Sequence, residues 1–176
     1  MAESAISTDD ILGQEFLTWL WYKSDLAPNS FKDLNGESFQ VSMEQRIVVQ
    51  SGNGETKEVA SVSGAFSNLS EAKYGLGMGK KVVRALLHLE KDAAAYQVTL
   101  KAEDFSLGSM RTPKIETKKE EIDADPDALF LEKIFLFEQG IGLLDALYKM
   151  FLDLRISKDW DAEVDAMRQW MEQDPT

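Results

Sequence analysis

The segment 12–25, LGQEFLTWLWYKSD, places six large apolar side chains within seven consecutive positions. They are Phe16, Leu17, Trp19, Leu20, Trp21 and Tyr22, and only Thr18 separates them. A helix at a protein surface keeps its apolar residues to one stripe, whereas this cluster spreads over most of the circumference. We therefore expect a helix over about residues 10–24 that lies between other layers of the protein.

The flanking residues and the spacing within this segment refine that prediction. Thr8 and the acids after it provide N-cap oxygens, and Pro28 disfavours helix at Ala27. We expect residues 1–9 to form a flexible N-terminus. Trp19 and Leu20 share one face with Phe16 and should be buried in the chain's own core, whereas Trp21 is the better candidate for a surface that meets a partner.

Alternating apolar and polar residues predict strands in the middle of the chain. The expected strands lie at 37–43, 46–55, 57–64, 81–92 and 94–105, and GNG at 52–54 marks a hairpin turn. A short helix falls within 68–81, and a basic loop that can include an edge strand follows over 106–121. In the second strand pair, the outward face should carry Arg84, His88, Gln97, Thr99 and Lys101.

The C-terminal part, residues 125–172, reads as two helices. Asp125 is a good N-cap and Pro126 suits the first helical position. An apolar stripe with alternating spacings of four and three then follows: Phe130, Ile134, Phe137, Ile141, Leu144, Tyr148 and Phe151. Gly140 and Gly142 interrupt it and indicate close packing or a break. A last helix places Trp160, Val164, Met167 and Trp170 on one face.

These elements predict one α+β domain over residues 1–176. We expect a mostly antiparallel sheet of about five strands, covered by an N-terminal helix and two C-terminal helices. The chain has no cysteine, which excludes disulfides and thiolate metal sites and fits a cytoplasmic location. No signal peptide is expected at the start, and no apolar run is long enough to span a membrane.

No motif in the chain specifies catalytic, cofactor-binding or metal-binding residues. YGLGMGKKV at 74–82 departs from the phosphate-binding loops, and its glycines lead from a helix into a strand instead of from a strand into a helix. DADPD at 123–127 opens like a calcium loop but lacks the required glycine and glutamate. His88, the only histidine, has no local partners for nucleophilic catalysis. We therefore predict no cofactor, and an enzyme of unrecognised type stays a lesser alternative.

Charge is distributed unevenly along the chain. The net charge is −12, yet residues 73–119 carry +5 between segments of −7 and −10. Phosphate binding requires clustered cations, not a positive total. If the strands bring this region together, it offers a candidate nucleic-acid interface with the following residues: Lys80, Lys81, Arg84, Lys101, Arg111, Lys114, Lys118 and Lys119.

The segment LGQEFLTWLWYKSD resembles a part of bacterial recombination-associated proteins of the RdgC type, in the C-terminal half of their long versions. EAKYGLGMGKKV, YQVTLKAEDFSLGSMRTP and LYKMFLDLRISKDWDAEVDAMRQWM are similar in the same order, so the resemblance spans about residues 10–172. It implies a non-enzymatic protein that binds DNA with little sequence preference and restrains recombination.

Two departures limit what the resemblance implies. RdgC-type proteins form ring-like dimers around duplex DNA, but this chain starts at its own Met1 and is expected to lack the N-terminal half, so a full ring is in doubt. No DNA-contact motif of the family can be transferred residue by residue. Two functions stay open: a nucleoid-associated protein that binds duplex DNA weakly, and an acidic protein-interaction module with no DNA role. A homodimer or a protein partner could use the aromatic helix faces.

Overall fold

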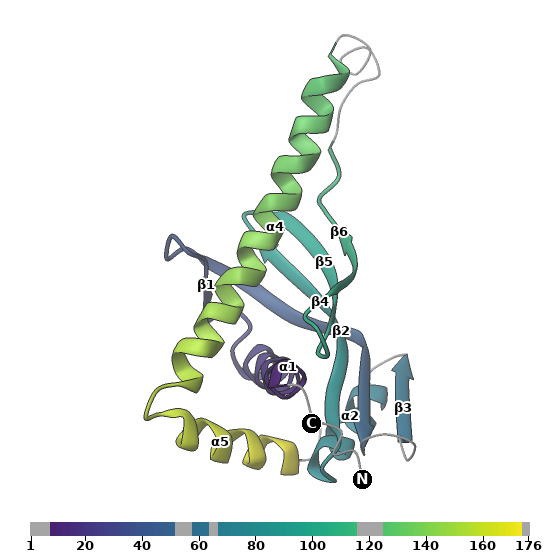
Figure 1. Ribbon diagram of the computed structural model, residues 1–176, viewed down its shortest axis with the longest axis vertical. Coiled ribbons are helices and arrows are strands. Elements are labelled where there is room, and N and C mark those ends of the chain that lie inside the picture. Colours follow the sequence, from purple (N-terminus) through teal and green to yellow (C-terminus); the bar gives the residue numbers. More distant parts are fainter. Residues whose placement is uncertain (1–7, 52–57, 64–66, 116–124, 174–176) are drawn as a thin grey trace.

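A computed structural model of the chain describes residues 8–51, 58–63, 67–115 and 125–173 (Figure 1). Its elements are helix α1 (Thr8–Leu26), strands β1 (Phe31–Lys32), β2 (Ser38–Ser51) and β3 (Glu58–Ser63), helix α2 (Ser67–Gly77), strands β4 (Lys81–Lys91), β5 (Ala94–Lys101) and β6 (Leu107–Arg111), and helices α4 (Pro126–Arg155) and α5 (Trp160–Glu172). The predicted α+β class and the N-terminal and two C-terminal helices are confirmed.

The strands form one antiparallel sheet in the order β1-β2-β4-β5-β6, and β3 also pairs with β2. The described strands number six, against the roughly five expected. The two strands predicted at 37–43 and 46–55 are one long strand, β2, which pairs with β4 along most of its length and with β3 along its second half. The turn expected at 52–54 and most of the N-terminus expected at 1–9 lie outside the described residues.

Helix α1 lies against the sheet on one side and against α4 and α5 on the other (Figure 1). Trp19 and Leu20 are only 2% and 0% exposed, as their helical face predicts. Trp21 is also buried, and its ring packs edge-on against Trp170 of α5 at 5.3 Å. Its predicted role as a partner surface is therefore wrong, because α5 covers the side of α1 that the sheet leaves open.

Polar contacts fix the position of α5 on α1. The indole Nε1 of Trp19 donates a hydrogen bond to Glu163 at 3.1 Å, and the Lys23 ammonium approaches the same carboxylate at 2.6 Å. The indole of Trp170 donates to Asp25 at 2.7 Å. The indoles of Trp19 and Trp170 thus each have an acceptor across the helix interface, which avoids the cost of an unsatisfied donor.

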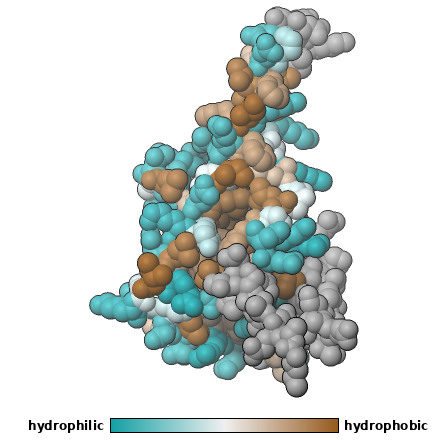
Figure 2. All heavy atoms as spheres, in the orientation of Figure 1, coloured by the Kyte–Doolittle hydropathy of each residue, from teal (hydrophilic) through white to brown (hydrophobic). Residues whose placement is uncertain are grey.

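The apolar stripe of α4 is only partly buried. Residues Gly140, Leu143, Ala146, Leu147 and Phe151 are the buried positions of this helix. Phe130, Ile134 and Phe137, which belong to the predicted stripe, are 63%, 39% and 46% exposed. A helix of 30 residues is roughly 45 Å long. Its first half rises past the sheet (Figure 1), and hydrophobic side chains gather on that projecting part (Figure 2).

Gly140 marks the place where α4 meets the sheet. A Cβ atom at this position would lie 2.1 Å from the Met110 side chain and 2.8 Å from the Tyr96 ring. The close packing expected at Gly140 is therefore confirmed. Gly142, by contrast, has open space around it. Among the described helices, none has the length and apolar character needed to cross a membrane.

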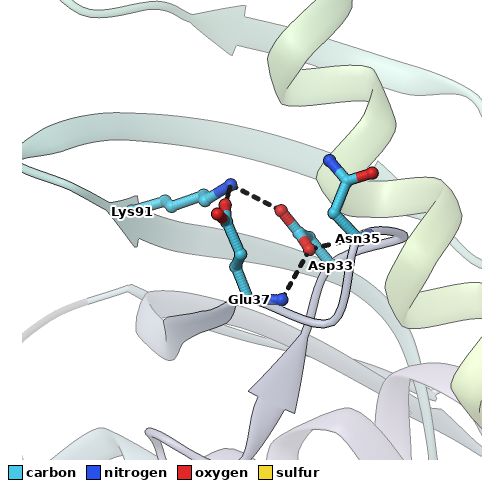
Figure 3. A network of polar contacts seen from close by, with 4 residues as sticks. All are labelled: Asp33, Asn35, Glu37 and Lys91. Carbon is cyan, nitrogen blue, oxygen red and sulfur yellow. Dashed lines mark hydrogen bonds and ion pairs between the residues drawn. The ribbon is translucent and has the colours of Figure 1, made fainter.

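A charged network joins the turn after β1 to the end of β4 (Figure 3). The Lys91 ammonium contacts the carboxylates of Asp33 and Glu37, each at 2.5 Å. Asp33 also accepts hydrogen bonds from the backbone N–H groups of Asn35 and Glu37. The hydrogen bond from Lys91, followed by these backbone bonds, lowers the pKa of Asp33 below its usual 3.8, and the two carboxylates raise the pKa of Lys91.

We predict that Trp19→Ala lowers the free energy of unfolding by about 3–5 kcal/mol, because it leaves a cavity in the core and removes the hydrogen bond to Glu163. A domain of this size has only about 5–15 kcal/mol in total. Urea denaturation measures the change. Tyr74→Ala, at a residue that is 70% exposed, is the control and should be nearly neutral. Equal stability of the two variants would contradict the core position of Trp19.

We predict that Lys91→Met lowers the melting temperature at neutral pH and that its effect shrinks in acid. Asp33 has a lower pKa when folded, so its stabilisation is present above the unfolded value of about 3.8 and is lost as pH falls through the folded pKa. Lys91, whose pKa is raised, adds stability below its unfolded pKa that is lost only as pH rises through the higher folded one. Melting curves between neutral pH and pH 3 test this. Lys149→Met, in an exposed pair with Asp153, should change stability little at any pH.

Candidate nucleic-acid interface

The candidate cations must be placed relative to the two faces of the sheet. All four described helices contribute to one hydrophobic core, which takes Ala85, Leu87 and Leu89 from β4 and Val98 and Leu100 from β5. The alternate residues point to the other side. We call this side the outer face, and its residues on β4, β5 and β6 are Arg84, Leu86, His88, Glu90, Ala95, Gln97, Thr99, Lys101, Ser109 and Arg111.

Arg84 and Lys101 form the centre of the candidate interface. They are direct cross-strand partners in the β4–β5 pair, so their side chains leave the same face side by side. Arg84 is exposed and Lys101 is half-buried. Like charges placed directly opposite each other destabilise a sheet unless an anion lies between them. This pair is therefore the point on the outer face that is best suited to a phosphate.

Arg111 extends the basic area along the sheet. It is the cross-strand partner of Gln97, which lies four residues from Lys101 on β5. Four residues of strand correspond to roughly 13 Å. Lys114 follows β6 and is exposed. Because the phosphates of one DNA strand follow each other about every 3.4 Å along the helix axis, this span covers several of them.

Lys80 and Lys81 lie at the other end, where β4 begins. Both line a groove of about 620 Å³ between α1, α2 and α5, whose floor includes Met167 and Met171. They therefore border the core side of the sheet as well as the start of the outer face. Lys118 and Lys119, also predicted for the interface, lie outside the described residues.

Within the described part of the chain, one central cation has an acidic neighbour: hydrogen bonds from Ser106 and, to a smaller extent, the charge of Lys101 lower the pKa of Asp104. None of the ion pairs found there includes Arg84, Lys101 or Arg111. On the helix side of the molecule, by contrast, Lys23 pairs with Glu163 and Arg155 pairs with Glu15. The ion pairs that join the helices therefore do not include the cations at the centre of the candidate interface.

Neutral polar groups, which sequence reasoning did not include in the site, complete the outer face. Thr99 and Ser109 are cross-strand partners with hydroxyl oxygens 3.1 Å apart, and Gln97 lies between His88 and Arg111. Such side chains contribute to phosphate and sugar contacts in many DNA interfaces. Their alternation on β5 and β6 was visible in the sequence, but the strand register that brings them beside the cations was not.

His88 occupies the solvated face of β4, as predicted, with its Nε2 3.8 Å from the Glu90 carboxylate. Over the described ranges, there is no group of three or more metal-ligating side chains. Asp125, in the segment that resembles a calcium loop, caps α4 by accepting a hydrogen bond from the N–H of Ala128. The outer face therefore carries cationic and neutral polar side chains, with Glu90 beside His88.

Comparison with protein-family models, with curated proteins and with solved structures finds no match for this chain. The resemblance to RdgC-type proteins accordingly stays a prediction. The case for a nucleic-acid interface depends on the geometry of the outer face together with that resemblance.

We predict that Arg84→Glu stabilises the protein by about 0.2–1 kcal/mol at low salt, because it replaces a like-charged cross-strand pair with an opposite-charged one. The gain should shrink as salt is added. Arg111→Glu is the matched control and should bring no gain, since its cross-strand partner is the neutral Gln97. Thermal melts at several salt concentrations measure both variants. A loss of stability in Arg84→Glu would show that Arg84 and Lys101 do not repel each other.

Proposed function

We propose that this protein is a non-enzymatic, RdgC-like accessory protein that binds duplex DNA weakly and without sequence preference through the outer face. The juxtaposition of Arg84 and Lys101 as cross-strand partners on the outer face carries the proposal. Arg111, Lys114, Lys80 and Lys81 extend the track of phosphate contacts. Such a protein would act in the bacterial cytoplasm, at the nucleoid, and would modulate recombination by occupying DNA.

The acidic total charge does not exclude this function. Most of the negative charge lies in the first and last thirds of the chain, which include α1, α4 and α5. These helices pack on the core side, so the outer face can meet DNA while the acidic helices point away from it. Binding through a few phosphates, opposed by a net charge of −12, should be weak and strongly dependent on salt.

A second function, that of an acidic protein-interaction module with no DNA role, is favoured by a different observation. The projecting half of α4 exposes large apolar side chains such as Phe130 and Leu131, both 63% exposed. Exposed apolar groups of this size mark surfaces that contact other proteins. Purification from the native cell after nuclease treatment separates the two functions, because a stoichiometric protein partner that survives would favour the module.

DNA binding itself is tested by fluorescence anisotropy with two short duplexes of unrelated sequence at several salt concentrations. We expect similar affinities for both duplexes, with a dissociation constant at physiological salt of about 10⁻⁶–10⁻⁴ M. Arg84→Ala and Lys101→Ala should each weaken binding and reduce the slope of log K against log salt by about one. Lys149→Ala, at an exposed lysine on α4, should change neither quantity.

Two results would contradict the proposal. One is the absence of binding even at low salt. The other is binding whose salt slope is the same in the wild type and in the Arg84→Ala/Lys101→Ala double variant. Circular dichroism of each variant confirms that the fold is intact, which is expected because neither side chain belongs to the hydrophobic core.

A further inference from the structure

The apolar stripe of α4 is covered at one end and open at the other. In the C-terminal half, Tyr148 and Phe151 each pack against Phe16 of α1, with ring centroids 5.4 Å apart. In the projecting half, Phe130 and Phe137 continue the same stripe but are 63% and 46% exposed. The stripe therefore extends beyond the hydrophobic core of a single copy of the chain.

The spacing of the stripe is that of a coiled-coil seam. Phe130, Ile134, Phe137 and Ile141 follow each other at intervals of four, three and four residues, which are the a and d positions of a heptad. With Ile134 and Ile141 at a, the phenylalanines occupy d. Figure 1 shows this part of α4 standing clear of the sheet, so a second helix can approach the seam.

We propose that the projecting half of α4 pairs with the same helix of a second copy, in parallel and in register. The charged residues beside the seam indicate that the pairing helix belongs to a second copy of this chain. Lys133 occupies the g position before Ile134, and Glu138 occupies the e position after Phe137. Both side chains are exposed, and neither takes part in an ion pair inside the described portion of the chain.

The orientation follows from how flanking positions meet. In a parallel pair, each g residue faces the e residue five positions later on the partner helix, so Lys133 of each copy faces Glu138 of the other. In an antiparallel pair, g meets g and e meets e. Lys133 would then lie beside Gly140 or a second Lys133, and Glu138 beside Leu131 or a second Glu138. Only the parallel pair brings the opposite charges together, and it does so twice.

The size of the seam sets the expected strength. Phe130, Leu131, Ile134 and Phe137 together expose on the order of 400 Å² of side chain on each copy. A standard stable interface buries about 800 Å² per partner. The pair should therefore be a reversible dimer that depends on protein concentration.

The first test uses sedimentation velocity over a hundredfold range of protein concentration. We expect the wild type to shift from monomer to dimer and Phe137→Asp to stay monomeric at all concentrations. Phe135→Asp is the matched control, because Phe135 is 57% exposed but lies off the seam, where it lines a cavity of about 400 Å³ with Leu34. It should dimerise like the wild type. A monomeric wild type, or equal effects of the two variants, would overturn the proposal.

The second test determines the orientation and uses the absence of native cysteine. Phe130→Cys and Phe137→Cys are prepared as separate single variants and oxidised. In a parallel pair in register, each d position meets its own copy, so both variants should form disulfide-linked dimers. An antiparallel pair can bring at most one of them close to itself. Crosslinking of only one variant, or of neither, would overturn the parallel register.

A charge exchange completes the test and does not depend on DNA binding. Lys133→Glu and Glu138→Lys should each weaken dimerisation, because each places like charges beside the seam. The double variant Lys133→Glu/Glu138→Lys should restore it. Failure of the double variant to recover would contradict the Lys133–Glu138 pairing, whereas failure of the DNA titration would leave this result unchanged. Circular dichroism confirms the helix content of every variant.

Discussion

The structure depends on the burial of α1. Its aromatic cluster is the point where the sheet, α4 and α5 meet: the Phe16 ring contacts Tyr148 and Phe151 of α4, and the Trp21 ring contacts Trp170 of α5. A helix with apolar residues around most of its circumference cannot remain at a surface. The C-terminal helices are therefore held on the side of the sheet where α1 lies, and the outer face carries mostly polar and charged side chains.

Much of this arrangement could be predicted from local patterns. Six large apolar residues among seven positions indicated a buried helix, and alternation on β4 and β5 assigned Arg84 and Lys101 to the outer face. Whether these two cations are neighbours depends on the register of two strands, which alternation alone does not specify. Periodicity likewise identified the apolar stripe of α4 but not where the sheet beneath it ends, so it did not show that Phe130, Ile134 and Phe137 would be exposed.

Trp21 illustrates the same limit of prediction from local sequence patterns. Trp21 lies beside the helical face of Trp19 and Leu20, and it was predicted to contact a partner protein. In the structure it contacts α5 of the same chain. The sequence indicates that an apolar side chain must be buried, but the element that buries it can be more than a hundred residues away. Gly140 is the converse case, since its lack of a side chain indicated close packing or a break, and the neighbouring Met110 and Tyr96 show close packing.

The separation of charge between the two sides of the molecule has a kinetic consequence. At low ionic strength, where the Debye length is about 30 Å at 0.01 M, a distant polyanion would be repelled by the protein's total charge of −12. At contact distance, the same polyanion would be attracted by the cations of the outer face. Added salt would then speed the approach by screening the repulsion, while it weakens the contact once formed. Added salt would therefore raise the association rate and shorten the lifetime of the complex. The two quantities would respond to ionic strength in opposite directions.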